Sequence, residues 1–84
     1  MKPIEDGPLK ADGYDAAIIG FEPSSQRFVY DRQKMITIAV YDMDMSHEDA
    51  IDHLGYNVWG AYLGEHTPIY IELGKYDELV DFLH

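Results

Sequence analysis

Short apolar runs separated by turn-forming residues make up the first third of this chain. Residues 14–21 have an apolar centre between Gly13 and Gly20, which is typical of a strand with a buried middle. Residues 27–30 form a second apolar run, and the polar segment 22–26 between the two runs contains a proline and two serines. A connection of this length and composition is compatible with an antiparallel hairpin.

Residues 32–42 allow two interpretations. Asp31 is a favourable N-cap for a helix, on which three apolar residues would share one face: Met35, Ile38 and Ala39. Residues 36–40, however, are mostly β-branched, and β-branched residues favour strands. Composition alone leaves the choice between helix and strand close to even.

The clearest helical pattern covers residues 47–63. Ser46 is a typical N-cap followed by two acids in the first turn, where the helix dipole favours them. Apolar residues then recur at helical spacing: Ala50, Ile51, Leu54, Val58, Ala61 and Tyr62. Gly64 stands where a helix usually ends. Gly55 and Gly60 each cost about 1 kcal/mol relative to alanine, and close packing of another backbone would explain them.

Two further elements complete the predicted fold. Residues 68–73 indicate a strand that starts at a proline, and the apolar residues of 76–83 line one face of a short helix. The pattern predicts an α+β fold of order β-β-α-α-β: a small three-stranded, at least partly antiparallel sheet packed by two helices, plus a short C-terminal helix. We expect three regions: an extended lead-in (1–11), a single α+β domain (12–73) and a helical tail (74–84).

Several short motifs, spread over roughly two-thirds of the chain, are shared with a known family. They are D-G-Y-D and A-I-I-G at 12–20, M-S-x-E-D-A at 45–50 and, most distinctive, Y-N-V-W-G-A-Y-L-G-E-H-T-P-I at 56–69. In these motifs the chain resembles a family of small uncharacterised bacteriophage-encoded proteins. The resemblance implies a helix over residues 32–42 and a small non-enzymatic factor that binds a host protein. It implies no established activity, and residues 73–84 lie outside it.

The charge of the chain is concentrated in its second half. Residues 42–84 contain ten carboxylates and one base, a net charge of −9, whereas residues 1–41 contain six acids and five bases, a net charge of −1. Such a surface repels nucleic acid and anionic lipid and attracts basic partners. We therefore expect neither direct nucleic-acid binding nor membrane binding.

Composition narrows the class of protein further. Eighty-four residues make one small domain, and 46% hydrophobic residues are too many for intrinsic disorder. The absence of cysteine excludes disulfide bonds and thiolate metal sites. The first six residues are not followed by the apolar segment that a signal peptide contains. No apolar run is long enough to span a membrane. The expected location is the cytoplasm, that of the host if the protein is phage-encoded.

The polar residues show no arrangement that indicates catalysis or a bound metal. The nucleophile-elbow and phosphate-loop motifs are missing. Residues 42–46 have the oxygen spacing of half a calcium loop, but His47 and His53 replace the required glycine and glutamate. Asp49, His53 and His66 are residue types that can bind zinc, but no H-E-x-x-H motif or second carboxylate–histidine pair accompanies them, and a solvated pair on the helix explains the first two. We expect a non-enzyme without catalytic residues, metal ion or cofactor.

Two other polar sets have both a functional and a structural interpretation. One set is either a small polar site or a hydrogen-bonded network between a helix end and the next strand: Asn57, Glu65 and Thr67. The network is favoured, because one amide and one carboxylate offer little chemistry. The other set consists of three bases around Asp31 that could form a modest anion site: Arg27, Arg32 and Lys34.

The acids and a surplus of aromatic residues together indicate protein docking. A core this small does not readily hide five large rings: Tyr41, Tyr56, Trp59, Tyr62 and Tyr76. Tyrosine and tryptophan commonly anchor interfaces. We predict a partner-binding surface that contains these residues: Asp42, Asp44, Glu48, Asp49, Asp52, Tyr56 and Trp59.

The expected function is to bind and modulate or inhibit a host protein with a basic surface, such as a defence or nucleic-acid-processing factor. One alternative is a mimic of DNA or RNA that occupies a basic groove, in which case binding would weaken steeply with salt. Another is a small-molecule-binding or minor enzymatic dimer. The small core and the abundant aromatic residues also favour a homodimer.

Overall fold

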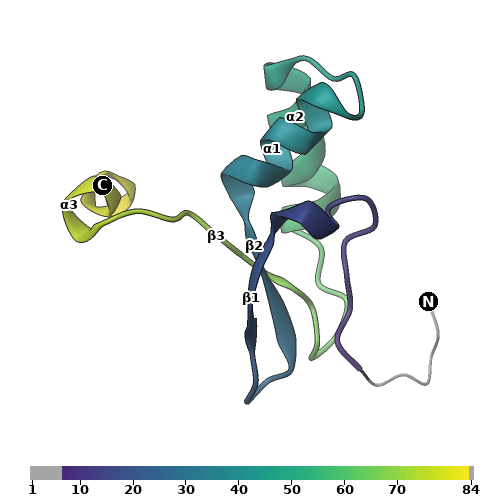
Figure 1. Ribbon diagram of the computed structural model, residues 1–84, viewed down its shortest axis with the longest axis vertical. Helices are drawn as coiled ribbons and strands as arrows, with labels where there is room; N and C mark the ends of the chain where they lie inside the picture. Colours follow the sequence, from purple (N-terminus) through teal and green to yellow (C-terminus); the bar gives the residue numbers. More distant parts are fainter. Residues whose placement is uncertain (1–6, 84) are drawn as a thin grey trace.

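Three strands and two longer helices form the body of the computed structural model, which describes residues 7–83 (Figure 1). In chain order the elements are β1 (Ile18–Glu22), β2 (Arg27–Asp31), α1 (Arg32–Tyr41), α2 (His47–Leu54), β3 (Ile69–Ile71) and α3 (Tyr76–Leu79). The α+β fold class expected from the sequence is confirmed. Residues 1–6 of the expected lead-in and residue 84 of the expected tail lie outside the described residues.

The sheet is mixed, with strand order β1-β2-β3. β1 and β2 pair antiparallel as the predicted hairpin, with Phe21 opposite Phe28 and their rings 5.3 Å apart. β2 and β3 pair parallel, with Val29 opposite Ile69. β1 starts later than predicted, because residues 15–17 form a 3₁₀ turn that buries Ala17.

α1 settles the ambiguous segment as a helix. The side chain of Asp31 caps it by accepting hydrogen bonds from the backbone N–H groups of Gln33 and Lys34, at 2.9 and 3.4 Å. Met35 and Ala39 are fully buried on its inner side. The cap and this packing outweigh the strand preference of the β-branched run, because tertiary contacts override weak local propensity.

α2 is shorter than the predicted helix 47–63. It begins at its Ser46 cap as expected but ends at Leu54, and a wider π-type turn covers Gly55–Trp59. The close backbone near Gly60 is the carbonyl oxygen of Gly55 itself, 3.2 Å from where a Cβ would stand. Around Gly55 nothing lies within 4 Å of that position, so the predicted packing of another backbone there is wrong. Gly64 has the left-handed φ of +118° but belongs to the following loop.

The core lies where the helical pair meets one end of the sheet. Its buried members are Tyr14, Ala17, Tyr30, Met35, Ile36, Ala39, Ala50 and Leu54. Figure 1 shows α1 and α2 above the strands, so they pack against the end of the sheet instead of covering a face. The segments around residues 8–14 and 60–68 run along one face of the strands, and the backbone N–H of Ala11 donates a 2.8 Å hydrogen bond to the Tyr30 hydroxyl.

The loop before β3 is fixed by the buried Thr67. Its hydroxyl donates to the carbonyl of Gly64 at 2.7 Å and accepts from the backbone N–H of Leu63 at 2.8 Å. Its carbonyl accepts a 2.6 Å hydrogen bond from Nε of Arg27 at the start of β2. These bonds satisfy the polar groups of a buried turn, as burial requires, and set the register at which β3 joins the sheet.

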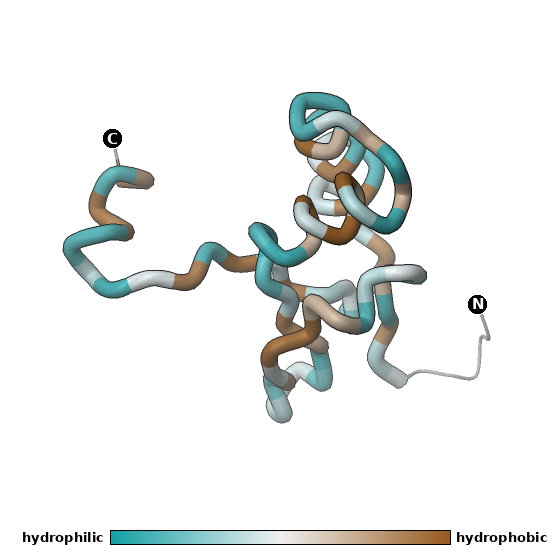
Figure 2. Tube along the Cα trace, turned by 45° about the horizontal axis from the view of Figure 1, so that its top comes forward, coloured by the Kyte–Doolittle hydropathy of each residue, from teal (hydrophilic) through white to brown (hydrophobic). Residues whose placement is uncertain are grey.

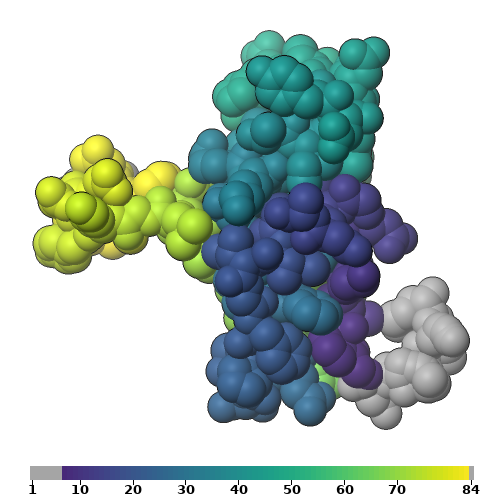
Figure 3. Space-filling model, in the orientation of Figure 1, coloured from purple at the N-terminus to yellow at the C-terminus, as the bar shows by residue number. Residues whose placement is uncertain are grey.

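The last described residues form an arm that stands away from the body. We call residues 73–83 the arm; it contains α3 and a 3₁₀ turn at Val80–Leu83. The space-filling view shows the arm projecting to one side of the molecule (Figure 3). The radius of gyration is 13.6 Å, compared with about 12 Å for a compact domain of this length.

Candidate protein-docking surface

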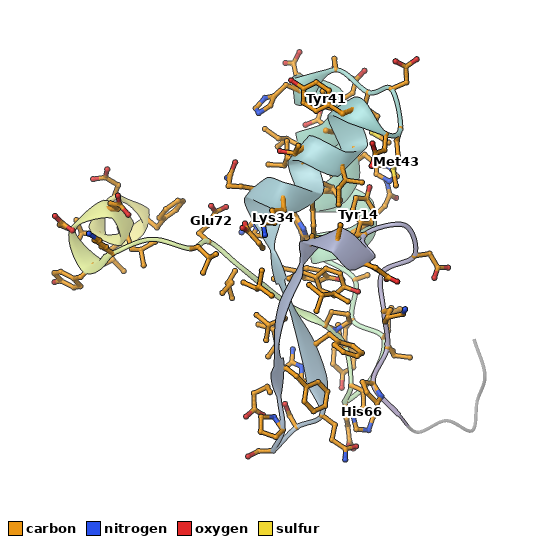
Figure 4. All side chains as sticks on the ribbon, viewed as in Figure 1. Tyr14, Lys34, Tyr41, Met43, His66 and Glu72 are labelled. Atoms are coloured by element: carbon orange, nitrogen blue, oxygen red, sulfur yellow. The ribbon has the colours of Figure 1, made fainter. Side chains whose placement is uncertain are left out.

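The predicted acidic residues lie together at the far end of the helical pair. All five carboxylates are exposed, two on the connection between the helices and three on α2: Asp42, Asp44, Glu48, Asp49 and Asp52. Tyr41 at the end of α1 is 81% exposed and Tyr56 beyond α2 is 86% exposed. We call these seven residues the acidic–aromatic surface; Tyr41 marks its position in Figure 4.

Local structure holds these side chains in place. The Ser46 hydroxyl accepts a 3.0 Å hydrogen bond from the backbone N–H of Asp49 and so fixes the first turn of α2. Asp44 adopts a left-handed φ of +58°, which turns the chain from α1 towards α2. Asp49, Asp52 and Tyr56 follow one another at intervals of three and four residues, so they project on the same side of the helix.

The carboxylates of this surface are not neutralised within the described chain. The two ion pairs among residues 7–83 lie elsewhere: Lys10 with Asp15 at 2.9 Å, and Arg32 with Glu72 at 3.8 Å. Five unpaired negative charges on one end of a small protein produce a local negative potential. That potential favours a basic partner and is screened by salt.

Four of the five large rings predicted to exceed the capacity of the core are exposed. Tyr62 and Tyr76 are 78% and 79% exposed, close to the values for Tyr41 and Tyr56. Tyr62 follows the π-type turn and Tyr76 belongs to the arm, so the tyrosines do not form a single patch. Tyr41 and Tyr56 are the two that accompany the acidic residues.

Trp59 departs from the predicted surface. Its ring is half buried and packs against the core. The Arg32 guanidinium lies 3.9 Å from the ring centroid, and the indole N–H points at the sulfur of Met35 at 3.4 Å. These contacts occupy the ring inside the chain, so Trp59 supports the fold and does not present a free face beside the acids.

The polar residues considered as metal ligands do not come together. Within the described residues there is no group of three or more side chains that could hold a metal ion. His53 contacts the amide of Asn57 at 3.2 Å on its own helix. His66 contacts the carbonyl of Ser25 at 3.1 Å, at the opposite end of the molecule from Tyr41 (Figure 4).

The predicted polar network is only partly present. Thr67 performs the expected structural role, but Asn57 bonds to His53 and Glu65 is exposed, so the three do not share one network. The three bases around Asp31 also separate. Arg27 bonds to Thr67, Arg32 lies over Trp59, and Lys34 is exposed on α1.

A pocket of about 270 Å³ is a feature that the sequence did not reveal. It lies between the N-terminal segment and the π-type turn, with Lys10, Tyr14, Met43, His53, Asn57 and Tyr70 among its lining residues. The Tyr14 hydroxyl points at the sulfur of Met43 at 3.2 Å, and burial raises the pKa of Tyr14. The lining comes from segments far apart in sequence, so no local motif marks it.

The comparisons with protein-family models, curated proteins and solved structures gave no match. The resemblance to bacteriophage proteins therefore stays a prediction. None of the helices in the described part of the chain has the length and apolar character needed to cross a membrane.

Proposed function

We propose that this protein is a non-enzymatic binding factor that docks a protein with a basic surface through its acidic–aromatic surface and thereby modulates that protein. The observation that carries the proposal is the gathering of five exposed carboxylates, which form no ion pair within residues 7–83, beside two tyrosines that are more than 80% exposed. A bacteriophage origin and a host target are part of this proposal.

The chemistry of the surface supports binding more than catalysis. Carboxylates at a rim steer a basic partner and raise its association rate, while tyrosines supply contact area at low entropic cost. Protein interfaces commonly combine aromatic residues at the centre with a polar rim. The partner would contribute lysine or arginine side chains and a flat or shallow site for the two rings.

The test is affinity capture of the partner from lysate of the source cell or its host, followed by quantitative binding with the purified partner. The charge-reversal variant Asp49→Lys with Asp52→Lys is expected to weaken binding on the order of 100-fold, because it replaces two attractions by two repulsions. Tyr56→Ala is expected to weaken binding about tenfold.

The matched control is Asp12→Lys with Glu65→Lys, which makes the same change in net charge at two exposed acids outside the surface. The control should bind nearly as well as the unchanged protein. Equal weakening by both charge reversals would show that only net charge matters and would reject the acidic–aromatic surface. Loss of the partner on addition of duplex DNA would identify the nucleic-acid mimic instead, since phosphates and carboxylates would then compete for one groove.

A further inference from the structure

One face of the sheet carries three neighbouring aliphatic side chains that residues 7–83 leave half-buried. Val29 pairs with Ile69, and Ile71 lies two residues further along β3, so their side chains share the face opposite to that of Tyr30. None of the three belongs to the core or packs against it, and the charged residues of this face, Glu22, Arg27 and Asp31, stand at its two ends. Gly20 lies opposite Val29 and has no side chain, so no side chain rises from this face at that position of β1. We call Gly20, Val29, Ile69 and Ile71 the aliphatic face.

A sheet face in contact with water normally carries polar residues at these alternating positions. β-branched aliphatic side chains on three neighbouring positions are typical of a face that another layer covers. Figure 2 shows hydrophobic segments along the strands and again in the arm. The described part of the body covers the aliphatic face only in part, and another layer would complete its burial.

The arm is a second apolar surface that is only partly covered, with Leu79 and Val80 half-buried. Four apolar residues recur at helical spacing and line one side of it: Tyr76, Leu79, Val80 and Leu83. Its acids, Asp77, Glu78 and Asp81, fall between them. Tyr76 is 79% and Leu83 is 74% exposed, and the arm stands clear of the body in Figures 1 and 3. An amphipathic helix of this kind is stable only when its apolar side is packed.

The connection to the arm directs it away from its own sheet. Glu72 is held at the body by Gln33, at 3.0 Å, and by Arg32. Three residues later α3 begins with a bond from the backbone N–H of Lys75 to Glu78 at 2.8 Å. A Cβ on Gly74 would stand 3.2 Å from the side chain of Leu79, so the connection is packed against its own helix. The arm therefore projects from the body, as Figures 1 and 3 show.

The dimensions of the two surfaces match. The eight helical residues of the arm span about 14 Å, and the five residues of β2 span about 16 Å. The accessible surface of the chain is 5896 Å², compared with roughly 5100 Å² for a compact monomer of this mass. The difference is of the order that one partner adds to a standard interface.

We propose that the arm of one molecule packs on the aliphatic face of a second copy, and that the reciprocal contact closes a two-fold symmetric homodimer. Each copy has one arm and one aliphatic face. In a two-fold dimer each arm covers the face of the other copy, so neither kind of surface is left in water. The acids of the arm remain on its outer side. This interface is separate from the acidic–aromatic surface and goes beyond the proposed function.

The first test is the mass in solution, measured by light scattering after size-exclusion chromatography over a range of concentrations. The unchanged protein should be a dimer, and Leu79→Glu with Leu83→Glu should raise the dissociation constant on the order of 100-fold. The control Tyr62→Glu with Leu63→Glu adds the same charge at exposed residues outside the arm and should stay a dimer. Circular dichroism checks that each variant is folded.

The second test exploits the absence of cysteine. A Leu79→Cys protein is mixed with a differently tagged Ile69→Cys protein, and a short bismaleimide reagent should join one tag to the other; Leu79→Cys with Tyr41→Cys should not be joined. A monomeric protein whose Leu79→Cys, Ile69→Cys double variant links only within one chain would overturn the proposal in favour of the arm covering its own sheet. A dimer that survives the arm variant would overturn it as well.

Discussion

The guanidinium of Arg32 lies 3.9 Å from the ring centroid of Trp59 and joins the start of α1 to the turn that follows α2. Nε of the same arginine is 3.8 Å from a carboxylate oxygen of Glu72, just beyond β3. Trp59 in turn points its indole N–H at the sulfur of Met35. One stacked pair thus connects three parts of the chain that are far apart in sequence.

Replacing Trp59 with alanine is expected to lower the free energy of unfolding by about 2–3 kcal/mol. Removing a buried tryptophan costs about 3–5 kcal/mol, and this ring is only half buried. Urea unfolding followed by far-UV circular dichroism measures the loss. Tyr62→Ala is the control, because its exposed ring should change stability by less than about 0.5 kcal/mol. Similar stability in the two variants would show that the stacked pair contributes little.

The hydroxyl of Tyr30 offers a second, smaller test. Tyr30→Phe removes the acceptor of the Ala11 backbone N–H and is expected to lower the free energy of unfolding by about 1–1.5 kcal/mol, since that group loses its partner. Tyr70→Phe is the matched variant, because the Tyr70 hydroxyl makes no hydrogen bond to residues 7–83. It should be nearly neutral at pH 7 in the same urea titration. A neutral Tyr30→Phe would mean that water replaces the lost acceptor without cost.

Stability is expected to fall in alkali. Burial, aided by the neighbouring Tyr30, raises the pKa of Tyr70 to about 12, compared with about 10 in an unfolded chain. Because the pKa of Tyr70 is higher in the folded state, its contribution to the free energy of unfolding is complete below about pH 10. That contribution is lost as the pH rises towards 12. The full shift would correspond to about 2.7 kcal/mol, and partial exposure of the ring reduces our expectation to about 1 kcal/mol.

Unfolding free energies measured from about pH 9 upwards, with tyrosinate absorbance recorded in parallel, test this expectation. Burial also raises the pKa of Tyr14 and of Tyr30, so Tyr70→Phe should flatten the decline without abolishing it. An unchanged slope in that variant would assign the alkaline loss to the other two tyrosines.

The sequence predicted those parts of the fold that depend on neighbouring residues. The hairpin, the Asp31 and Ser46 caps and the exposure of the acids on α2 follow from local composition, and each is present. The sequence did not predict the early end of α2. Gly60 lies close to the carbonyl oxygen of Gly55, and the apolar pattern, which continues up to Tyr62, gives no sign of this contact.

Features that depend on distant contacts were not predictable in this way. Arg32 and Met35, which precede Trp59 by more than twenty residues, contact its ring and hold it away from the docking surface. The pocket beside Tyr14 and the parallel pairing of β3 likewise arise from long-range packing. Single-sequence periodicity describes which side of an element is apolar, but it does not say which distant element covers that side.

The two helix caps should differ in their contribution to stability. Asp31 is buried and accepts two backbone hydrogen bonds, whereas Ser46 is exposed and accepts one. Asp31→Ala is therefore expected to lower the free energy of unfolding by about 2 kcal/mol and Ser46→Ala by about 1 kcal/mol. Asp31→Asn should recover most of the loss, because its amide oxygen can accept the same bonds. If Asp31→Asn is as unstable as Asp31→Ala in urea unfolding, the negative charge beside the start of α1, and not the cap geometry, stabilises this helix.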